Sequence, residues 1–528
     1  MEAGERWTLH DIVGNPIYSW NSRGQRNRIV YDRLRRPLNV FFREGVHAEL
    51  LVERTIYGES LPNPETKNLR GEAVQVADQA GIVTNGAFDQ KGNLLKTDRQ
   101  LAVAYDVMLN WSVSVQLGLE TYSSRTRYDA LNRPVQIIVP HSDAPGTKIS
   151  VIQPQYNKAN LLERMYTWQE RMAEPIAILD PATASVTVVI DIQYDAKGQR
   201  TLIDYGNGVR QTYAYDPLTY QLKYLVTSRD SSVFPGDCPR PPPTGWLGCQ
   251  VQNLRYIYDP SGNITHLRDD AQQTIYFRNR RVEPKAEYLY DALYRLIEAR
   301  GREHIGQVAT PVPHSYNDIS RIRLPHPGDG NAMGNYRERY VYDPVGNIQS
   351  MQHLGTHPAH AGWTRSYVYD EASQLEPARY SNRLTSTTVG ADTETYSVDG
   401  DGYDSHGNML RMPQLQEMVW DFKDQLRMTR RQAVNPEDIS GIDHQGEVTF
   451  NVYDSTGQRV RKITQLNSGQ LKDERIYLGG FEIYRKYGGD PLRRETLQIT
   501  DQTQRVALIE TRTEGSEPGI PVQAFRYQ

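Results

Sequence analysis

At 528 residues the chain is long enough for several ordinary domains or for one large repeat architecture. Hydrophobic residues make up 38% and the mean hydropathy is -0.66, which excludes one deep spherical core, yet the composition is not that of a disordered protein. The net charge of -4 gives no basic footprint for nucleic acid or anionic membranes, and no apolar run approaches the roughly 18 residues that cross a bilayer.

Tyrosine is the unusual residue of this composition, with 34 tyrosines against 9 phenylalanines. Its apolar ring and polar tip suit a sheet with one packed and one wet face. The 40 glycines and 30 prolines supply many turns. The composition therefore predicts an all-β protein with more than about 40% strand and less than about 10% helix. Helical patterning of any length is scarce, and Leu161–Met172 is the best candidate for a helix.

The N-terminal residues Met1 to His10 lack the basic and apolar segments of a secretory signal. We therefore expect a protein that is cytoplasmic, that is exported by another route, or whose true N-terminus lies further upstream. We divide the chain into a region 1–120 that leads into repeats and a repeat region 121–528, which contains a proline-rich loop at 234–250.

The dipeptide Tyr-Asp recurs along the chain more often than the composition predicts, and this is the main signal of the sequence. Its eleven copies begin at Tyr31, Tyr105, Tyr128, Tyr194, Tyr215, Tyr258, Tyr290, Tyr342, Tyr369, Tyr403 and Tyr453. The short spacings are 21, 23 and 27 residues, and the spacing of 43 fits two units. Such a period is typical of a repeat protein.

The residues after the dipeptide are also shared, in the pattern Tyr-Asp-x-x-Gly-Asn or Tyr-Asp-x-x-Gly-Gln, with Asn or Tyr in place of Gly in two copies. The motif residues that we assign a structural role are Tyr128, Asp129, Tyr194, Asp195, Gly198, Tyr258, Asp259, Gly262, Asn263, Tyr290, Asp291, Tyr342, Asp343, Gly346, Asn347, Tyr403, Asp404, Gly407, Asn408, Tyr453, Asp454 and Gly457.

Each repeat reads as a β-hairpin. The alternating run Arg339–Tyr342 predicts a strand with tyrosines on one face, and Ile348–Met351 predicts the returning strand. Between them, Asp can close an Asx-turn while Gly or Asn takes the left-handed conformation. One hairpin is marginal alone, so stacked hairpins are expected to form a long, curled antiparallel sheet that buries its tyrosine face.

Other patterns suggest chemistry, but each has a simpler structural interpretation. Asp399–Asp404 has the spacing of a calcium loop, but Leu410 stands where the last carboxylate is needed, so a repeat turn is expected. His353, His357 and His360 could in principle bind zinc, but Pro358 breaks any helix that would align them and no cysteine or carboxylate cluster is close in the sequence, so a solvated loop is expected. Gly328–Gly330 is interpreted as a linker.

Cys238 and Cys249 lie in the proline-rich loop and are either disulfide-bonded or two free thiols. No nucleophile elbow is present, and neither cysteine has a histidine nearby in the sequence. The sequence therefore predicts no catalytic residue, no metal site and no cofactor.

At these motifs the chain resembles the Rhs/YD-repeat family, most of all the B and C components of bacterial insecticidal toxin complexes. The B-like stretches, which lie in the region 1–120, are Arg54–Glu59, Asn68–Gly71, Asp78–Gly81 and Lys91–Leu95. The C-like stretches are Ser381–Leu384, Trp420–Leu426 and Tyr477–Glu482. Because one chain carries both sets of stretches, it resembles a natural fusion of B-like and C-like material.

The resemblance implies a hollow, cocoon-like shell that encloses an unfolded toxic segment, which an aspartate autoprotease then cuts free. The Asp-Pro-x-Gly-Leu motif of that protease is absent, so no protease residue is assigned. The virulence-type domain and the propeller of B components are also missing. The chain is therefore expected to be a middle piece that stops near Phe525–Gln528, where the terminal core would begin.

The function expected from this resemblance is a non-catalytic, secreted or cell-surface shell. Its partners would be the encapsulated toxin segment and other toxin-complex components, among them a channel-forming A-like subunit. Neither nucleic acid nor a membrane span is expected. The alternative is a cell-surface adhesion or carbohydrate-binding protein, because YD repeats also occur in such proteins and exposed tyrosines can stack on sugars.

Overall fold

The computed structural model describes residues 3–230, 232–233, 250–305, 332–355, 362–397, 401–432, 445–501 and 504–527. The chain divides into two compact units. The first is discontinuous and comprises Met1–Val188 together with Asp399–Gln528, and the second, the central unit, comprises Val189–Val398.

The N-terminal part of the discontinuous unit is a run of strands that ends before the unit boundary. The strands are β1 (Arg6–His10), β2 (Pro16–Asn21), β3 (Gln25–Tyr31), β4 (Pro37–Glu44), β5 (Leu50–Tyr57), β6 (Ala73–Asp78), β7 (Gly81–Phe88), β8 (Leu94–Ala102), β9 (Leu117–Tyr128), β10 (Pro134–Ser142), β11 (Ile149–Tyr156) and β12 (Leu162–Arg171). Three short 3-10 helices accompany them, at Gly58–Ser60, Pro64–Lys67 and Pro181–Thr183.

The central unit begins within β13 and continues to β27. Its strands are β13 (Val186–Tyr194), β14 (Arg200–Tyr205), β15 (Arg210–Tyr215), β16 (Leu222–Ser228), β17 (Gln250–Tyr258), β18 (Ile264–Asp269), β19 (Ile275–Phe277), β20 (Arg280–Val282), β21 (Lys285–Tyr290), β22 (Leu296–His304), β23 (Met333–Tyr342), β24 (Ile348–Gly355), β25 (Trp363–Val368), β26 (Ser386–Val389) and β27 (Asp392–Thr395).

The C-terminal part of the discontinuous unit forms one nine-stranded sheet. Its strands are β28 (Leu415–Trp420), β29 (Leu426–Gln432), β30 (Gln445–Tyr453), β31 (Arg459–Gln465), β32 (Leu471–Leu478), β33 (Phe481–Lys486), β34 (Leu492–Thr500), β35 (Arg505–Glu514) and β36 (Gln523–Tyr527).

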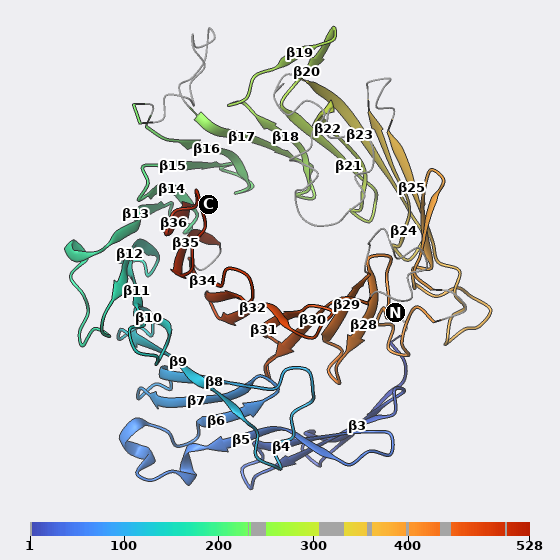
Figure 1. The fold of residues 1–528 in the computed structure, drawn as a ribbon. Helices are drawn as coiled ribbons and strands as arrows, with labels where there is room; N and C mark the ends of the chain where they lie inside the picture. Colours follow the sequence, from blue (N-terminus) through green and yellow to red (C-terminus); the bar gives the residue numbers. More distant parts are fainter. Residues whose placement is uncertain are drawn as a thin grey trace. The chain divides into compact units, whose positions relative to one another are not determined.

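Strands that follow one another in the sequence pair side by side and antiparallel (Figure 1). This holds from β1 to β12, from β13 to β18, from β21 to β27 and from β28 to β36. Strand β18 pairs directly with β21, and the hairpin β19–β20 forms a separate two-stranded sheet. The expected all-β fold of hairpins in a long antiparallel sheet is confirmed.

The prediction of a helix at Leu161–Met172 is wrong, because Leu162–Arg171 form strand β12. Met165 and Trp168 are both buried although their side chains leave opposite faces of the strand. Trp168 packs against Ile138 and Val151, whereas Met165 lines a cavity on the other face. Because both faces are covered, the apolar residues lose the alternation of a strand and imitate helical spacing.

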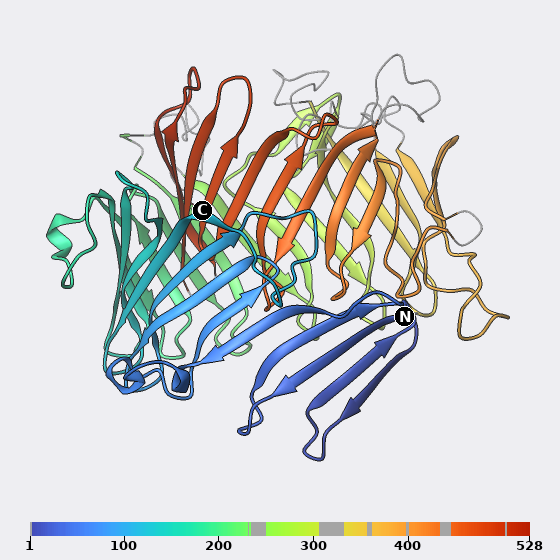
Figure 2. The same ribbon diagram turned by 60° about the horizontal axis from the view of Figure 1, so that its bottom comes forward.

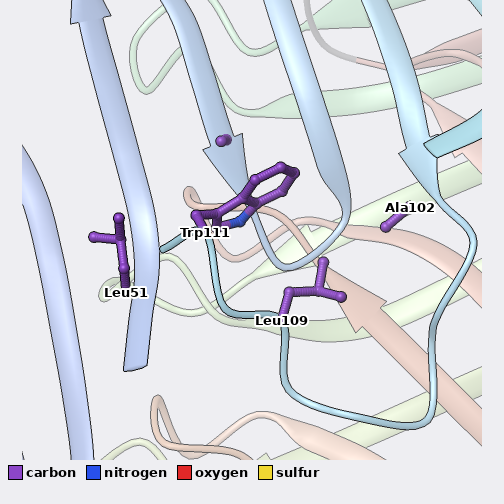
Figure 3. Close-up of a cluster of buried hydrophobic side chains, with 5 residues drawn as sticks. Leu51, Ala102, Leu109 and Trp111 are labelled. Carbon is purple, nitrogen blue, oxygen red and sulfur yellow. The ribbon is translucent and has the colours of Figure 1, made fainter. Parts of the chain in front are cut away.

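The segment 103–116 carries a small core between strands. Leu109 and Trp111 pack against Leu51 and Ala102 (Figure 3). The indole nitrogen of Trp111 donates a hydrogen bond to the carbonyl of Asp78 at 3.0 Å. This cluster holds the segment that connects β8 and β9 against the sheet.

Candidate functional site

The repeat turn has one geometry, which Asp343 illustrates. Its Oδ1 accepts hydrogen bonds from the backbone N–H groups of Val345 at 3.0 Å and Asn347 at 2.8 Å, and its Oδ2 accepts one from the Asn347 side chain at 2.8 Å. Gly346 has a φ of 103°, in the region that favours glycine. The carboxylate therefore holds the whole turn in place.

The same carboxylate geometry is found at the other assigned aspartates. Each accepts from the backbone N–H groups two and four residues later, at Asp129, Asp195, Asp259, Asp291, Asp404 and Asp454. The residue three positions after the aspartate has positive φ at Gly198, Gly262, Gly407 and Gly457. Asn263 and Asn408 repeat the side-chain bond of Asn347, at 2.8 and 3.0 Å.

Among the described residues, five further turns of this kind carry no Tyr-Asp dipeptide and were missed from the sequence. Their first residues accept from the backbone N–H groups two and four residues later; they are Asp11, Asn21, Asp89, Asn157 and Asp421. A search for Asp or Asn followed by the turn residues, with any residue before it, would have found them. In contrast, Tyr105 ends no strand; it lies in segment 103–116 and is not a repeat member.

The repeat tyrosines make a second recurring contact that the dipeptide does not reveal. The hydroxyl of Tyr342, the last residue of β23, donates to the carbonyl of Leu296, the first residue of the neighbouring β22, at 2.8 Å. We call this contact the tyrosine latch. It recurs at 2.8 to 3.2 Å in the pairs Tyr31–Pro16, Tyr57–Pro37, Tyr156–Pro134, Tyr258–Leu222, Tyr290–Ile264, Tyr369–Ile348 and Tyr453–Leu426.

An arginine reinforces the latch where it replaces the last Asn or Gln of the turn. Arg295 forms an ion pair with Asp291 at 2.7 Å, and its guanidinium carbon lies 4.9 Å from the ring centroid of Tyr342. Arg133 does the same with Asp129 and with the Tyr156 ring. Each such arginine joins one turn to the tyrosine of the next repeat, through charge and through a cation–π contact.

Replacing Asp343 with alanine tests the turn. We expect the free energy of unfolding to fall by about 1 kcal/mol, because one backbone-binding side chain is lost. Chemical denaturation of the variant measures this, with Asp392→Ala on the exposed strand β27 as the matched control. An effect equal to that of the control would mean that the aspartate is surface decoration.

The turn carboxylates also predict a pH dependence. A hydrogen bond from the Asn263 side chain lowers the pKa of Asp259 below its ordinary value of 3.8, and the backbone N–H of Arg295 lowers the pKa of Asp291. A carboxyl group with a lowered folded-state pKa stabilises the fold above its unfolded pKa, and this stability is lost as the pH falls.

The stability that these turn carboxylates contribute should therefore be constant from pH 7 to about pH 5 and should be lost below about pH 4, and the denaturant midpoint measures it. The variant Asp259→Asn keeps the shape of the turn but cannot titrate, so its midpoint should fall less steeply. A steeper fall in the variant would contradict the role of this carboxylate.

The two parts of the discontinuous unit meet along a line of contacts that we call the seam (Figure 2). At one end Phe42 and Phe422 pack with ring centroids 5.0 Å apart. Arg23 donates to the carbonyls of Trp420 and Asp421 and to the carboxylate of Asp424, at 3.1, 3.1 and 2.8 Å. The turn after β28 is thus held by the N-terminal strands.

Asp78 lies at the middle of the seam and is 1% exposed. Its Oδ2 accepts from the backbone N–H of Ser455 at 3.0 Å, and Arg99 lies 3.4 Å from the carboxylate of Asp454. Burial raises the pKa of Asp78. The repeat turn that begins at Asp454 therefore also binds the opposite part of the unit.

The far end of the seam is a partly buried charge network around Arg485. One terminal nitrogen, Nη2, lies 2.8 Å from both carboxylate oxygens of Glu120 and 3.0 Å from the Tyr122 hydroxyl, and Nη1 lies 3.5 Å from Glu474. Burial alone would lower the pKa of Arg485, but Tyr122, Glu120 and Glu474 raise it above its ordinary value. Tyr487 donates to Glu474 at 2.7 Å.

The solvated loop expected at His353 is wrong, because His353 lies in strand β24 and is buried. Both ring nitrogens of His353 face carboxylates, with Nε2 2.9 Å from Glu303 and Nδ1 3.1 Å from Glu338, and its ring lies between those of Tyr336 and Trp363. Within the described ranges no group of three or more His, Cys, Asp or Glu could hold a metal ion. His357, His360, Cys238, Cys249, Asp399 and Gly328–Gly330 lie outside the described residues.

The geometry described above is that of a sheet built from repeated hairpins, and comparison with known proteins shows which proteins this chain resembles. No protein-family profile matches the chain. The toxin subunits YenC1 and YenC2 of Yersinia entomophaga are 27% and 26% identical to it, over 94% of this chain and 46% and 49% of their own length. The chain is homologous to Tc toxin B and C components. It spans about half the length of these curated relatives.

Solved Tc toxin structures have the same fold. The crystal structure of TcdB2-TccC3 covers 100% of this chain and 23% of its own length, with a TM-score of 0.78 at 22% identity. A Photorhabdus luminescens Tc holotoxin pore covers 100% and 22%, with a TM-score of 0.77 at 22% identity. Among the described residues, no helix is long and apolar enough to cross a membrane.

Proposed function

We propose that this chain is a structural wall of a Tc toxin shell, which encloses a toxic segment and helps to deliver it. The observation that supports this most is the tyrosine latch, which links each repeat to the one before it at eight places in the described residues. A wall needs strands joined in series, whereas binding chemistry would need convergent side chains.

The homology with toxin subunits supports the proposed partners and location. The partners are the enclosed toxin segment and a channel-forming A-like component of the complex, and the protein acts after secretion or at the cell surface. Residues 1–120 are the B-like region that leads into the repeats, and 121–528 form the repeat shell. The assigned tyrosines, aspartates and glycines have a structural role, and the wall itself is non-catalytic.

Expression of residues 1–528 tests this proposal. Among the described residues, β1 pairs only with β2 and β36 only with β35, so each presents one open edge. Open edges recruit further strands, so the isolated chain should associate or aggregate unless a B-like or C-like neighbour covers them. Light scattering measures its size, and a gel followed over days should show no self-cleavage.

One result would contradict the proposed wall function, and a second would contradict only the expected association. A specific cleavage product, or hydrolysis of a model ester or peptide, would show that the chain is more than a wall. A clean monomer would show that its edges are blunted. Sequencing the neighbouring coding region is a further check, because a propeller upstream and an autoprotease core downstream are expected.

A further inference from the structure

Two neighbouring hairpin tips near the N-terminus expose apolar side chains beside arginines. The tip between β1 and β2 carries Ile12 and Val13, which are 97% and 50% exposed. The tip between β3 and β4 carries Leu34, which is 69% exposed, and the residues on either side of it, Arg33 and Arg35, are exposed as well. Single exposed aliphatic residues are ordinary, whereas several in one place mark a contact surface.

The two tips lie side by side. Strands β1 to β4, dark blue in Figure 2, pair antiparallel in sequence order, so the turns after β1 and after β3 are at the same end of the sheet. The hydroxyl of Tyr31 at the end of β3 donates to the carbonyl of Pro16 at the start of β2, at 2.8 Å, and this latch holds the tips together. Because neighbouring strands are about 4.8 Å apart, the tips are about 10 Å apart.

The charge of this region is opposite to that of the whole chain. Residues 6–44 contain eight arginines and three carboxylates, a net charge of +5, whereas the chain as a whole carries -4. At the β3–β4 tip Arg36 pairs with Asp32 and Glu59. Arg33 and Arg35 form no ion pair with any residue that the structure describes. Their charges are therefore available to an anionic partner.

Arg35 also stands where the repeat turns usually have glycine. It lies three residues after Asp32 and has a φ of 62°, and the same position is Gly262 or Gly346 in other turns. Glycine takes this conformation without strain, so an arginine here lowers the stability of the turn. The positive charge is thus present at this tip although glycine would suit the backbone better.

Behind the tips, one face of the first hairpin is aromatic. Trp7 pairs with Trp20 across β1 and β2, and the ring of Tyr18 stacks on Trp20 with centroids 5.6 Å apart. Trp7 and Trp20 are 51% and 38% exposed. This face is opposite to the one from which Phe42 packs in the seam. Tryptophan and tyrosine are enriched where a protein surface meets the head groups of a bilayer.

We propose that the two tips are a docking site for a lipid bilayer with anionic head groups, in which Ile12, Val13 and Leu34 enter the bilayer surface while Arg33 and Arg35 bind the head groups. Buried apolar area and attraction to anionic lipids together give the binding strength of proteins that lie on a membrane. The aromatic face then stands at the level of the head groups. This inference does not depend on the proposed wall function.

Single-stranded nucleic acid fits this surface less well. Bases would stack on the exposed tryptophans, and the backbone would then need the nearest arginines. Those are Arg26 and Arg28, which both pair with Glu49, at 3.1 and 2.5 Å. The arginines without an ion pair are instead at the tips, next to aliphatic side chains that offer no ring to a base.

Flotation of the chain 1–528 with vesicles in a density gradient tests the proposal, because vesicle-bound protein floats whereas aggregated protein sinks. The chain should float with vesicles of equal parts phosphatidylcholine and phosphatidylserine. With phosphatidylcholine alone at least about tenfold less should float, because the attraction of the arginines is lost. Added salt should lower flotation with the anionic vesicles, since it screens exposed charges.

Variants place the contact at the tips. Ile12→Asp should lower flotation about tenfold, because a carboxylate replaces an inserted side chain. The matched control is Leu218→Asp, since Leu218 is 86% exposed in the turn after β15, which contains no arginine. Arg35→Gly removes one charge and relieves the positive φ, so flotation should fall about fivefold while the Tm rises slightly. A variant that is more stable yet binds less cannot owe the loss to misfolding.

The proposal is overturned if the wild-type chain stays at the bottom with anionic vesicles, or if it floats equally well with neutral ones. It is also overturned if Ile12→Asp floats no less than Leu218→Asp, or if Arg35→Gly floats like the wild type. A single-stranded oligonucleotide that binds the chain, and whose binding Arg35→Gly weakens while vesicles do not compete with it, would assign the tips to nucleic acid and overturn the proposal as well.

Discussion

Replacing Arg485 with alanine should lower the free energy of unfolding of the discontinuous unit by about 2 to 3 kcal/mol, in the range for the loss of hydrogen bonds to a charged group. The side chains of Glu474, Arg485 and Glu120 are 2%, 22% and 30% exposed. Removal of the guanidinium takes from Glu120 both of its 2.8 Å bonds, while Glu474 keeps its ion pair with Arg461. A carboxylate that loses its charged partner in a partly desolvated place costs more than the ion pair itself contributes.

Urea denaturation of wild type and Arg485→Ala measures this difference. Arg70→Ala is the control, because Arg70 pairs with Glu65 at 3.2 Å in the same unit while both side chains are largely exposed, at 68% and 57%. The control should change stability by less than about 0.5 kcal/mol. Equal effects of the two substitutions would show that the network around Arg485 does not hold the seam.

Replacing Tyr342 with alanine should lower the free energy of unfolding by about 3 kcal/mol, in the range for the loss of a large aromatic side chain. Replacing it with phenylalanine should cost about 1 kcal/mol, because only the hydroxyl bond to the Leu296 carbonyl is lost. The difference between the two variants is the contribution of the ring, which lies half-buried against the Arg295 guanidinium.

The matched control for Tyr342→Ala is Tyr276→Ala. Tyr276 belongs to the same central unit, but it is 73% exposed on the β19–β20 hairpin. Its substitution should change stability by less than about 0.5 kcal/mol in chemical denaturation. If Tyr342→Ala were no more harmful than this control, the repeat tyrosines would not be packing residues, and the latch would not join the repeats.

The sequence predicts the turns well because their chemistry is local. Asp343, Gly346 and Asn347 lie within five residues and bind one another, so their pattern is visible in a short window. It does not predict the latch, since the carbonyl that Tyr342 binds is 46 residues away and any residue type can supply it.

The seam could not be predicted for a similar reason. Arg485 and Glu120 are separated by 365 residues, and neither belongs to a motif. Tyr105 shows the opposite error, because it begins a Tyr-Asp dipeptide but does not belong to a repeat hairpin. Its hydroxyl instead accepts a hydrogen bond from Gln465 at 2.7 Å in the seam. Local sequence patterns carry no information about such long-range pairs of charged and polar residues.

Protease protection tests the central claim, that this chain is a wall around another segment, most directly. The complete gene product that contains residues 1–528 is digested under native conditions, and its fragments are followed by mass spectrometry, for the wild type and for Arg485→Ala. The account predicts that a segment outside residues 1–528 resists cleavage in the wild type and becomes sensitive in the variant, while Arg70→Ala leaves the protection intact. Equal cleavage of all segments in the wild type, or protection that the opened seam does not change, would contradict it.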